Sequence, residues 1–292
     1  MTDHISPLIS VSQLYDLLKN APEKLRLFDV TVNLPSPRFD GDYRLSDDAK
    51  GWQSKHIPQA RYCNILDEKI ADHSAPYSFA PTDNQTLIKG LEEIGVDSNA
   101  SIVLYDRGSG FWAARLWWVL KSIGVEAKVL DGGFSAWVQA GYPIESGNIE
   151  NFSKGHIIYD IQKNMWSSLA EVKNIVENNS NNLLICALSE DVFKGKSPTR
   201  YTRRGHIPKS ICIPARSMHD SQGRFLPVSE LKKKIDPLFK KNRSIVLYCG
   251  GGISAASLAL AFAICGRDVS IYDGSLQEWT AQLHLPIVTE DI

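Results

Sequence analysis

An internal repeat limits the folds open to this 292-residue chain more than any other property of its sequence. The segment IVLYDRGSG, which begins at Ile102, returns as IVLYCGGGIS at Ile245. In each copy an apolar, β-branched run leads into a glycine-rich turn, an apolar segment that ends near Gly124 or Gly266, a second short apolar run, a D-G turn and a tryptophan. This order predicts a strand, a turn, a helix and a second strand. Such self-similarity indicates two homologous domains in tandem.

A second pair of matching motifs lies upstream of the first pair. KHIPQA begins at Lys55 and GHIPKS at Gly205, and we expect His56 and His206 within these motifs to be structural turn residues. Residues 141–154, between the copies, hold Pro, Gly, Ser and Asn with little apolar periodicity, which is typical of a linker. We therefore expect one domain over residues 1–150 and a second over 151–292, each of ordinary size.

The fold class follows from the alternation of two periodicities. Short apolar runs alternate with segments of helical periodicity, among them residues 11–19, 85–94 and 167–178. Alternation of this kind is typical of parallel sheets that are covered by helices on both faces. The predicted class is α/β, with two tandem domains that each hold a parallel sheet flanked by helices.

Composition excludes several classes of function. The formal net charge of −1 and the scattered lysines and arginines give no basic field for nucleic acid or an anionic membrane. No stretch approaches 18 uncharged apolar residues, and the first residues lack the basic and apolar regions of a secretory signal. We expect a cytoplasmic protein whose partner is a small molecule or a protein thiol.

The five cysteines form no CxxC pair and no spacing with histidine that is typical of zinc, so we expect neither a disulfide framework nor a metal site. Four of them lie in apolar or strand-like contexts and are expected to be buried, namely Cys63, Cys186, Cys212 and Cys265. Only Cys249 stands between an apolar β-branched run and three glycines that open an apolar helical segment.

Cys249 occupies the position at which parallel sheets bind ligands, the carboxyl end of a strand. Glycines can adopt backbone conformations that direct several N–H groups toward one atom, and a helix amino terminus adds a further positive potential. Such surroundings lower the pKa of a thiol and stabilise a thiolate. We predict that Cys249 is a nucleophile. Its predicted binding loop is Gly250, Gly251, Gly252, Ile253 and Ser254. The alternative is an ordinary strand-to-helix loop whose glycines only permit packing.

Three motifs resemble, in the correct order, those of the rhodanese and 3-mercaptopyruvate sulfurtransferase family. They are RRGHIP from Arg203, CGGGISA from Cys249 and YDGS with a following EW from Tyr272. The resemblance implies a tandem rhodanese-like fold and transfer of sulfane sulfur through a persulfide on Cys249. The implied partners are a small sulfur donor and an acceptor, either cyanide or a thiol such as thioredoxin or glutathione. It implies no cofactor and no metal.

The first domain carries Asp106 where the second carries Cys249, which is similar to the family's amino-terminal domain without a nucleophile. Since an aspartate cannot carry sulfane sulfur, we expect this domain to be a structural partner that walls the cleft. Two domains of one chain can form such a cleft, so we expect a monomer.

The resemblance also bears on the donor. An uncharged loop is similar to the branch that uses 3-mercaptopyruvate, which we favour, whereas a basic loop suits thiosulfate. That branch holds the donor carboxylate with two arginines; here Val192 stands at the first position and Arg200 at the second. Lys194 is the predicted substitute for the missing arginine, as a point charge without the planar fork. Leu188 stands where the family carries another arginine.

Two other functions are compatible with this domain type. A dual-specificity phosphatase needs an arginine six residues after its cysteine, and Ala255 occupies that place, which argues against a phosphatase. A non-catalytic sulfur carrier or regulatory module that acts on a protein partner is the remaining alternative.

Overall fold

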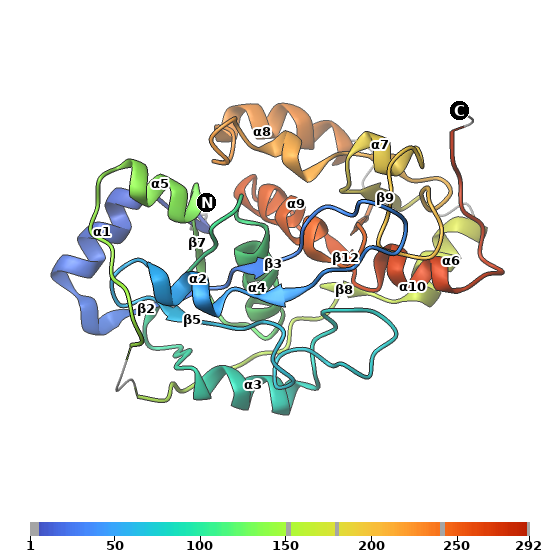
Figure 1. The fold of residues 1–292 in the computed structure, drawn as a ribbon. Helices are drawn as coiled ribbons and strands as arrows, with labels where there is room; N and C mark the ends of the chain where they lie inside the picture. The colour runs from blue at the N-terminus through green and yellow to red at the C-terminus, as the bar shows by residue number, and fades with distance from the viewer. Residues whose placement is uncertain (1–5, 150–152, 179–180, 240–242, 291–292) are drawn as a thin grey trace.

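The structure is a computed structural model that describes residues 6–149, 153–178, 181–239 and 243–290 (Figure 1). The first half contains a short 3-10 helix at Pro22–Lys24 besides its helices and strands. These are β1 (Leu8–Ile9), α1 (Val11–Asn20), β2 (Leu25–Asp29), β3 (Val32–Asn33), β4 (Ser46–Asp47), α2 (Ala49–Ser54), β5 (Arg61–Tyr62), α3 (Asn84–Glu93), β6 (Ser101–Tyr105), α4 (Phe111–Ser122), β7 (Lys128–Leu130) and α5 (Gly133–Gln139).

The second half repeats most of this order, without a counterpart of the antiparallel pair β3 and β4 among its described residues, and it has 3-10 helices at Ala215–Met218 and Asp236–Phe239. Its helices and strands are β8 (Trp166–Ser167), α6 (Leu169–Glu177), β9 (Leu183–Cys186), α7 (Glu190–Phe193), β10 (Ile211–Cys212), α8 (Val228–Ile235), β11 (Ile245–Tyr248), α9 (Ile253–Ile264), β12 (Ser270–Tyr272) and α10 (Ser275–Ala281).

Each half forms a five-stranded sheet in which all strand pairs are parallel. The strand orders are β1-β7-β6-β2-β5 and β10-β9-β11-β12-β8. Read from its other end, the second order is β8-β12-β11-β9-β10, and each of its strands is the counterpart of the strand at the same place in the first order. The shared topology confirms the predicted pair of α/β domains. The three predicted helices are present as α1, α3 and α6, with ends that lie within two residues of the prediction.

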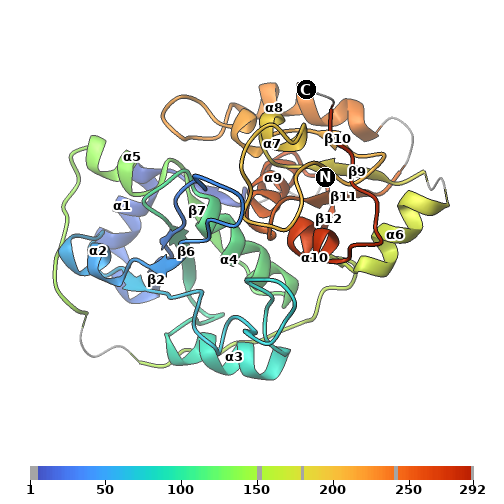
Figure 2. The same ribbon diagram turned by 45° about the vertical axis from the view of Figure 1, so that its right-hand side comes forward.

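The two domains meet along equivalent helices. Helices α4 and α9 pack side by side at the centre of the molecule (Figures 1 and 2). Both are apolar around most of their circumference, and helices of that kind are buried. Residues of both helices belong to one continuous apolar core. The interface is therefore part of the hydrophobic core, and the glycine-rich loops that precede α4 and α9 face one another across it.

The HIP turns have the same structural role in both domains. The Nδ1 atom of His56 lies 2.9 Å from the carbonyl oxygen of Trp52, and that of His206 lies 2.8 Å from the carbonyl oxygen of Phe193. The backbone of each histidine also pairs with the last segment of its own domain, at Glu145 or at Val288. The expectation that both histidines are turn residues agrees with these contacts.

The segment between the domains is attached to the first one. Backbone hydrogen bonds join Gly155 to Glu92 and Asp160 to Ile123, and β8 begins the second sheet at Trp166. The predicted boundary at residue 150 itself lies outside the described residues, and it stays a prediction. No helix within the described ranges is long and apolar enough to cross a membrane.

Candidate active site

Cys249 directly follows β11, the central strand of the second sheet, and so lies at the carboxyl end of a strand as expected. Its exposed fraction is only 2%. It lines a cavity of about 440 Å³ to which both domains contribute side chains. The first domain supplies Tyr43, Phe79 and Trp112 among others, and the second supplies the Cys249 loop. Because the cysteine is enclosed, any substrate must enter this cavity to reach it.

The D-G-S motif holds the backbone of Cys249 in place. The Cys249 N–H donates to the Ser275 hydroxyl at 3.1 Å, and this hydroxyl donates to the Tyr272 carbonyl at 2.8 Å. The N–H groups of Leu276 and Gln277, in the first turn of α10, donate to the carbonyls of Cys249 and Gly250 at 3.0 and 2.9 Å. The Cys249 loop and the segment from Tyr272, which both resemble family motifs in sequence, are therefore hydrogen-bonded to one another.

The three loop glycines meet different steric demands. A Cβ atom on Gly250 would make ordinary van der Waals contact with the Tyr201 ring at 3.5 Å. One on Gly251 would press against the Gln277 side-chain oxygen at 3.0 Å. Gly252 has φ of +82°, and its Cβ would lie 2.6 Å from a carboxylate oxygen of Asp273. Only Gly252 is therefore required on both steric and conformational grounds.

We accordingly expect Gly252→Ala to lower the free energy of unfolding by about 2 kcal/mol or more, since an L residue is strained at this φ and the new methyl group displaces Asp273. Gly250→Ala is the matched control, expected to change it by less than about 0.5 kcal/mol. Urea unfolding of both variants measures the difference. Equal free energies of unfolding for the two variants would contradict the conclusion that position 252 requires glycine.

The equivalent loop of the first domain shows which groups of such a turn bind a carboxylate. The Asp106 carboxylate accepts hydrogen bonds from four backbone N–H groups at 2.9 to 3.1 Å, those of Gly108, Gly110, Trp112 and Ala113. Burial raises the pKa of Asp106, and these amides oppose the rise by favouring the carboxylate. Gly110 and Gly252 precede α4 and α9 with φ of +79° and +82°.

The structure brings Arg200 to this cavity but not Lys194. Arg200 lines the cavity with Cys249, and one of its terminal nitrogens donates to the carbonyls of Leu34 and Pro35 at 3.3 and 2.5 Å. Lys194 does not line it, because its ammonium group lies between Glu190 and Glu290 at 3.8 and 3.6 Å. The predicted use of Lys194 as a substitute arginine is therefore not supported by its position.

The two positions that the resemblance assigns to further arginines line the cavity as apolar side chains. Leu188 and Val192 both line it, alongside Ile253 of the cysteine loop. Of the predicted binding loop, Gly250, Gly251 and Ser254 line it as well, whereas Gly252 lies behind them against Asp273.

A buried ion pair joins the two domains directly behind the loop. The Arg115 guanidinium, on α4, donates to both carboxylate oxygens of Asp273 at 2.5 and 3.1 Å and also to the Phe79 carbonyl at 2.5 Å. The two side chains are 3% and 7% exposed. Gly252 packs against this pair, so the ion pair lies next to both the domain interface and the cysteine loop.

Residues 10–140 and 168–282 match the family of the rhodanese-like domain, one copy in each sheet-forming half. The chain belongs to the rhodanese family. Thiosulfate/3-mercaptopyruvate sulfurtransferase 1, mitochondrial, of Arabidopsis thaliana is 31% identical over 96% of this chain and 78% of its own length. The 3-mercaptopyruvate sulfurtransferase of Escherichia coli K12 is 29% identical over 82% of this chain and 85% of its own. These relatives confirm the predicted enzyme class, a sulfurtransferase.

Solved structures agree with the rhodanese fold. The crystal structure of the Escherichia coli 3-mercaptopyruvate sulfotransferase SseA superposes with a TM-score of 0.76 at 24% identity, covering 92% of this chain and 98% of that one. Tum1 of Saccharomyces cerevisiae superposes with a TM-score of 0.80 at 22% identity, covering 98% of each chain. At these identities the likeness concerns the fold.

Several residues that line the Cys249 cavity were not predicted from the sequence. Arg216 lines it from the 3-10 helix after β10; its guanidinium donates to the Ser109 hydroxyl of the other domain and lies 5.5 Å from the centre of the Phe111 ring. Tyr201 and Gln277 line it too. Tyr201 follows the predicted Arg200 directly, but no local pattern distinguishes Arg216 from a surface arginine.

Proposed function

We propose that this sulfurtransferase moves sulfane sulfur from a small anionic donor, 3-mercaptopyruvate or alternatively thiosulfate, to a thiol or to cyanide through a persulfide on Cys249. The observation that carries the proposal is the buried Cys249 in the loop between β11 and α9, whose counterpart in the first domain holds a carboxylate with four backbone amides. A persulfide anion, like a carboxylate, is stabilised by hydrogen-bond donors that converge on it.

In the first half-reaction the Cys249 thiolate attacks the donor's sulfur. The Cys249 Sγ–S bond forms while the bond from that sulfur to the rest of the donor breaks, and the donor remnant leaves with the bonding electron pair. In the second, an acceptor thiolate attacks the outer sulfur and Cys249 leaves again as a thiolate. Each half exchanges one sulfur bond for another, so the protein's task is to stabilise sulfur anions and exclude competing nucleophiles.

The charges of the cavity favour an anionic donor. Arg200 and Arg216 line it, and the one carboxylate in its lining, that of Asp106, is already satisfied by backbone amides. A guanidinium is suited to a carboxylate or a sulfonate-like group. The uncharged loop and the name of the Escherichia coli relative support 3-mercaptopyruvate as the donor, whereas the Arabidopsis relative is named for both donors.

Arg200→Ala is expected to raise KM for 3-mercaptopyruvate about tenfold or more, and to raise KM for thiosulfate less, because it removes a charge-assisted hydrogen bond to the carboxylate. Lys194→Ala is the matched control: its ammonium is paired with Glu190 and Glu290 outside the cavity, so it should leave both KM values unchanged. Steady-state kinetics with both donors measure the effect. Equal increases for the two donors would argue against a carboxylate contact.

The function itself is tested by comparing turnover of 3-mercaptopyruvate and thiosulfate with cyanide and with reduced thioredoxin as acceptors. Rapid transfer from either donor supports the enzyme, and the faster donor identifies the substrate. A Cys249 persulfide that forms from a cysteine desulfurase, without turnover of either small donor, would replace the proposal with a sulfur carrier. Both walls of the cavity come from one chain, which supports a monomer. The cytoplasmic location stays a prediction from the sequence.

A further inference from the structure

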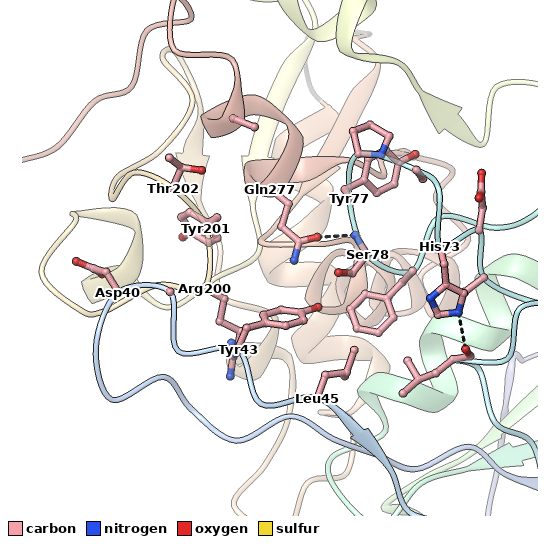
Figure 3. A pocket seen from close by; sticks show the side chains of 18 residues that line it. Asp40, Tyr43, Leu45, His73, Tyr77, Ser78, Arg200, Tyr201, Thr202 and Gln277 are labelled. Carbon is pink, nitrogen blue, oxygen red and sulfur yellow. Dashed lines mark hydrogen bonds between the residues drawn. The ribbon is translucent and has the colours of Figure 1, made fainter.

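A second, larger cavity adjoins the one that contains Cys249. We call it the outer chamber; it measures about 680 Å³ and lies between residues 71–79 of the first domain and a wall made of Tyr43, Arg200 and Tyr201 (Figure 3). The two cavities share this wall together with Phe79 and Gln277. The outer chamber is within the size range of small-molecule sites, and it exceeds what a three-carbon donor would fill.

The shared wall carries polar groups without a partner. The Tyr43 hydroxyl, the Tyr201 hydroxyl and the Arg200 Nε are buried, and none has a hydrogen-bond partner among the described residues. Tyr201 as a whole is 9% exposed, and burial raises its pKa, so the hydroxyl keeps its proton and remains a donor. Unpaired buried donors are costly, and at a cavity wall they indicate a ligand that accepts hydrogen bonds.

The wall leads directly to the cysteine loop. The Tyr201 ring is the nearest neighbour of the place where a Gly250 side chain would be, one residue after Cys249. Gln277 lies beside Gly251 in the same way, and its side-chain oxygen accepts from the Ser78 N–H at 2.9 Å across the domain interface (Figure 3). An acceptor in the outer chamber would therefore lie next to the cysteine loop.

We propose that the outer chamber binds the sulfur acceptor, and that this acceptor is a peptide-sized thiol rich in carbonyl oxygens, seated on Tyr43, Arg200 and Tyr201. This rests on the proposed function. The aromatic rings of Tyr43, Tyr77, Phe79 and Tyr201 supply faces for its apolar parts, and the hydroxyls and Nε supply donors to its oxygens. Its thiolate attacks the outer sulfur of the Cys249 persulfide and leaves as a persulfide, while Cys249 is released as a thiolate.

The test uses the full-length protein, loaded with donor until intact mass shows one added sulfur atom, and then mixed with either glutathione or 2-mercaptoethanol. The variants Tyr43→Phe and Tyr201→Phe remove only hydroxyls that have no partner in the free protein, so they preserve its internal hydrogen bonds. Each is expected to lower the rate constant for glutathione about three- to tenfold relative to that for 2-mercaptoethanol, the effect of one hydrogen bond. Tyr159→Phe, at a 57% exposed surface position, is the matched control.

A further variant tests whether the acceptor occupies the outer chamber, independently of the hydrogen bonds it makes there. Ala281→Trp places a large ring at an exposed position that lines only the outer chamber, and it should lower the glutathione rate more than the 2-mercaptoethanol rate. Equal losses for both thiols, or no loss in any of the three variants, would overturn the acceptor site. If the wild-type protein never gains the sulfur atom, the proposed function fails, and this outcome is seen before any acceptor is added.

Discussion

Cys249→Ser is expected to abolish sulfur transfer, with a loss of at least about a thousandfold in kcat, while the protein remains folded. A hydroxyl is not ionised near neutral pH and cannot form the persulfide on which both half-reactions depend. The side chain changes by one atom at a 2% exposed position, so packing changes little. Steady-state transfer and intact mass after donor treatment measure the effect.

Cys265→Ser is the matched control, since Cys265 is also buried and lies at the opposite end of the same helix, α9. It should retain transfer and accept one sulfur atom at Cys249. Retained transfer in Cys249→Ser, or a sulfur atom found on another cysteine, would show that the nucleophile has been misassigned.

Arg115→Ala is expected to lower the free energy of unfolding by about 3–5 kcal/mol, because it leaves the buried carboxylate of Asp273 without its partner. It also releases the Phe79 carbonyl, which Arg115 holds at 2.5 Å while Phe79 has φ of +66°. Urea unfolding monitored by tryptophan fluorescence and by circular dichroism measures the loss.

The double variant Arg115→Met with Asp273→Leu separates the charge effect from packing. Replacement of a buried ion pair by apolar side chains of similar size is often neutral in stability, so the double variant should recover most of the loss. Recovered stability with impaired sulfur transfer would mean that the pair also positions the cysteine loop through Gly252. A loss below about 1 kcal/mol in Arg115→Ala would contradict the burial of the pair.

Lys194 and Arg216 show that the direction of a side chain could not be predicted from the sequence. Lys194 is two residues from Val192, which lines the cavity, yet its side chain leaves α7 toward two glutamates. Arg216 is far from any predicted site residue, yet it lines the cavity and donates to Ser109 of the other domain. Sequence proximity does not determine the direction of a side chain, and no spacing rule connects residue 216 with residue 109.

Local patterns in the sequence predict the two α/β domains, which the structure confirms, and they single out Cys249 as the candidate nucleophile. Strand and helix periodicities and the glycine-rich turn after β11 are local, and the repeat doubled each of these signals. The side chains that surround Cys249 are defined by how the two domains pack together. The cavity is lined by side chains from residues 34–43, Phe79, Arg200 and Arg216, which packing of α4 against α9 brings together. Such contacts between distant segments depend on the shared core, and they leave no periodic pattern in the chain.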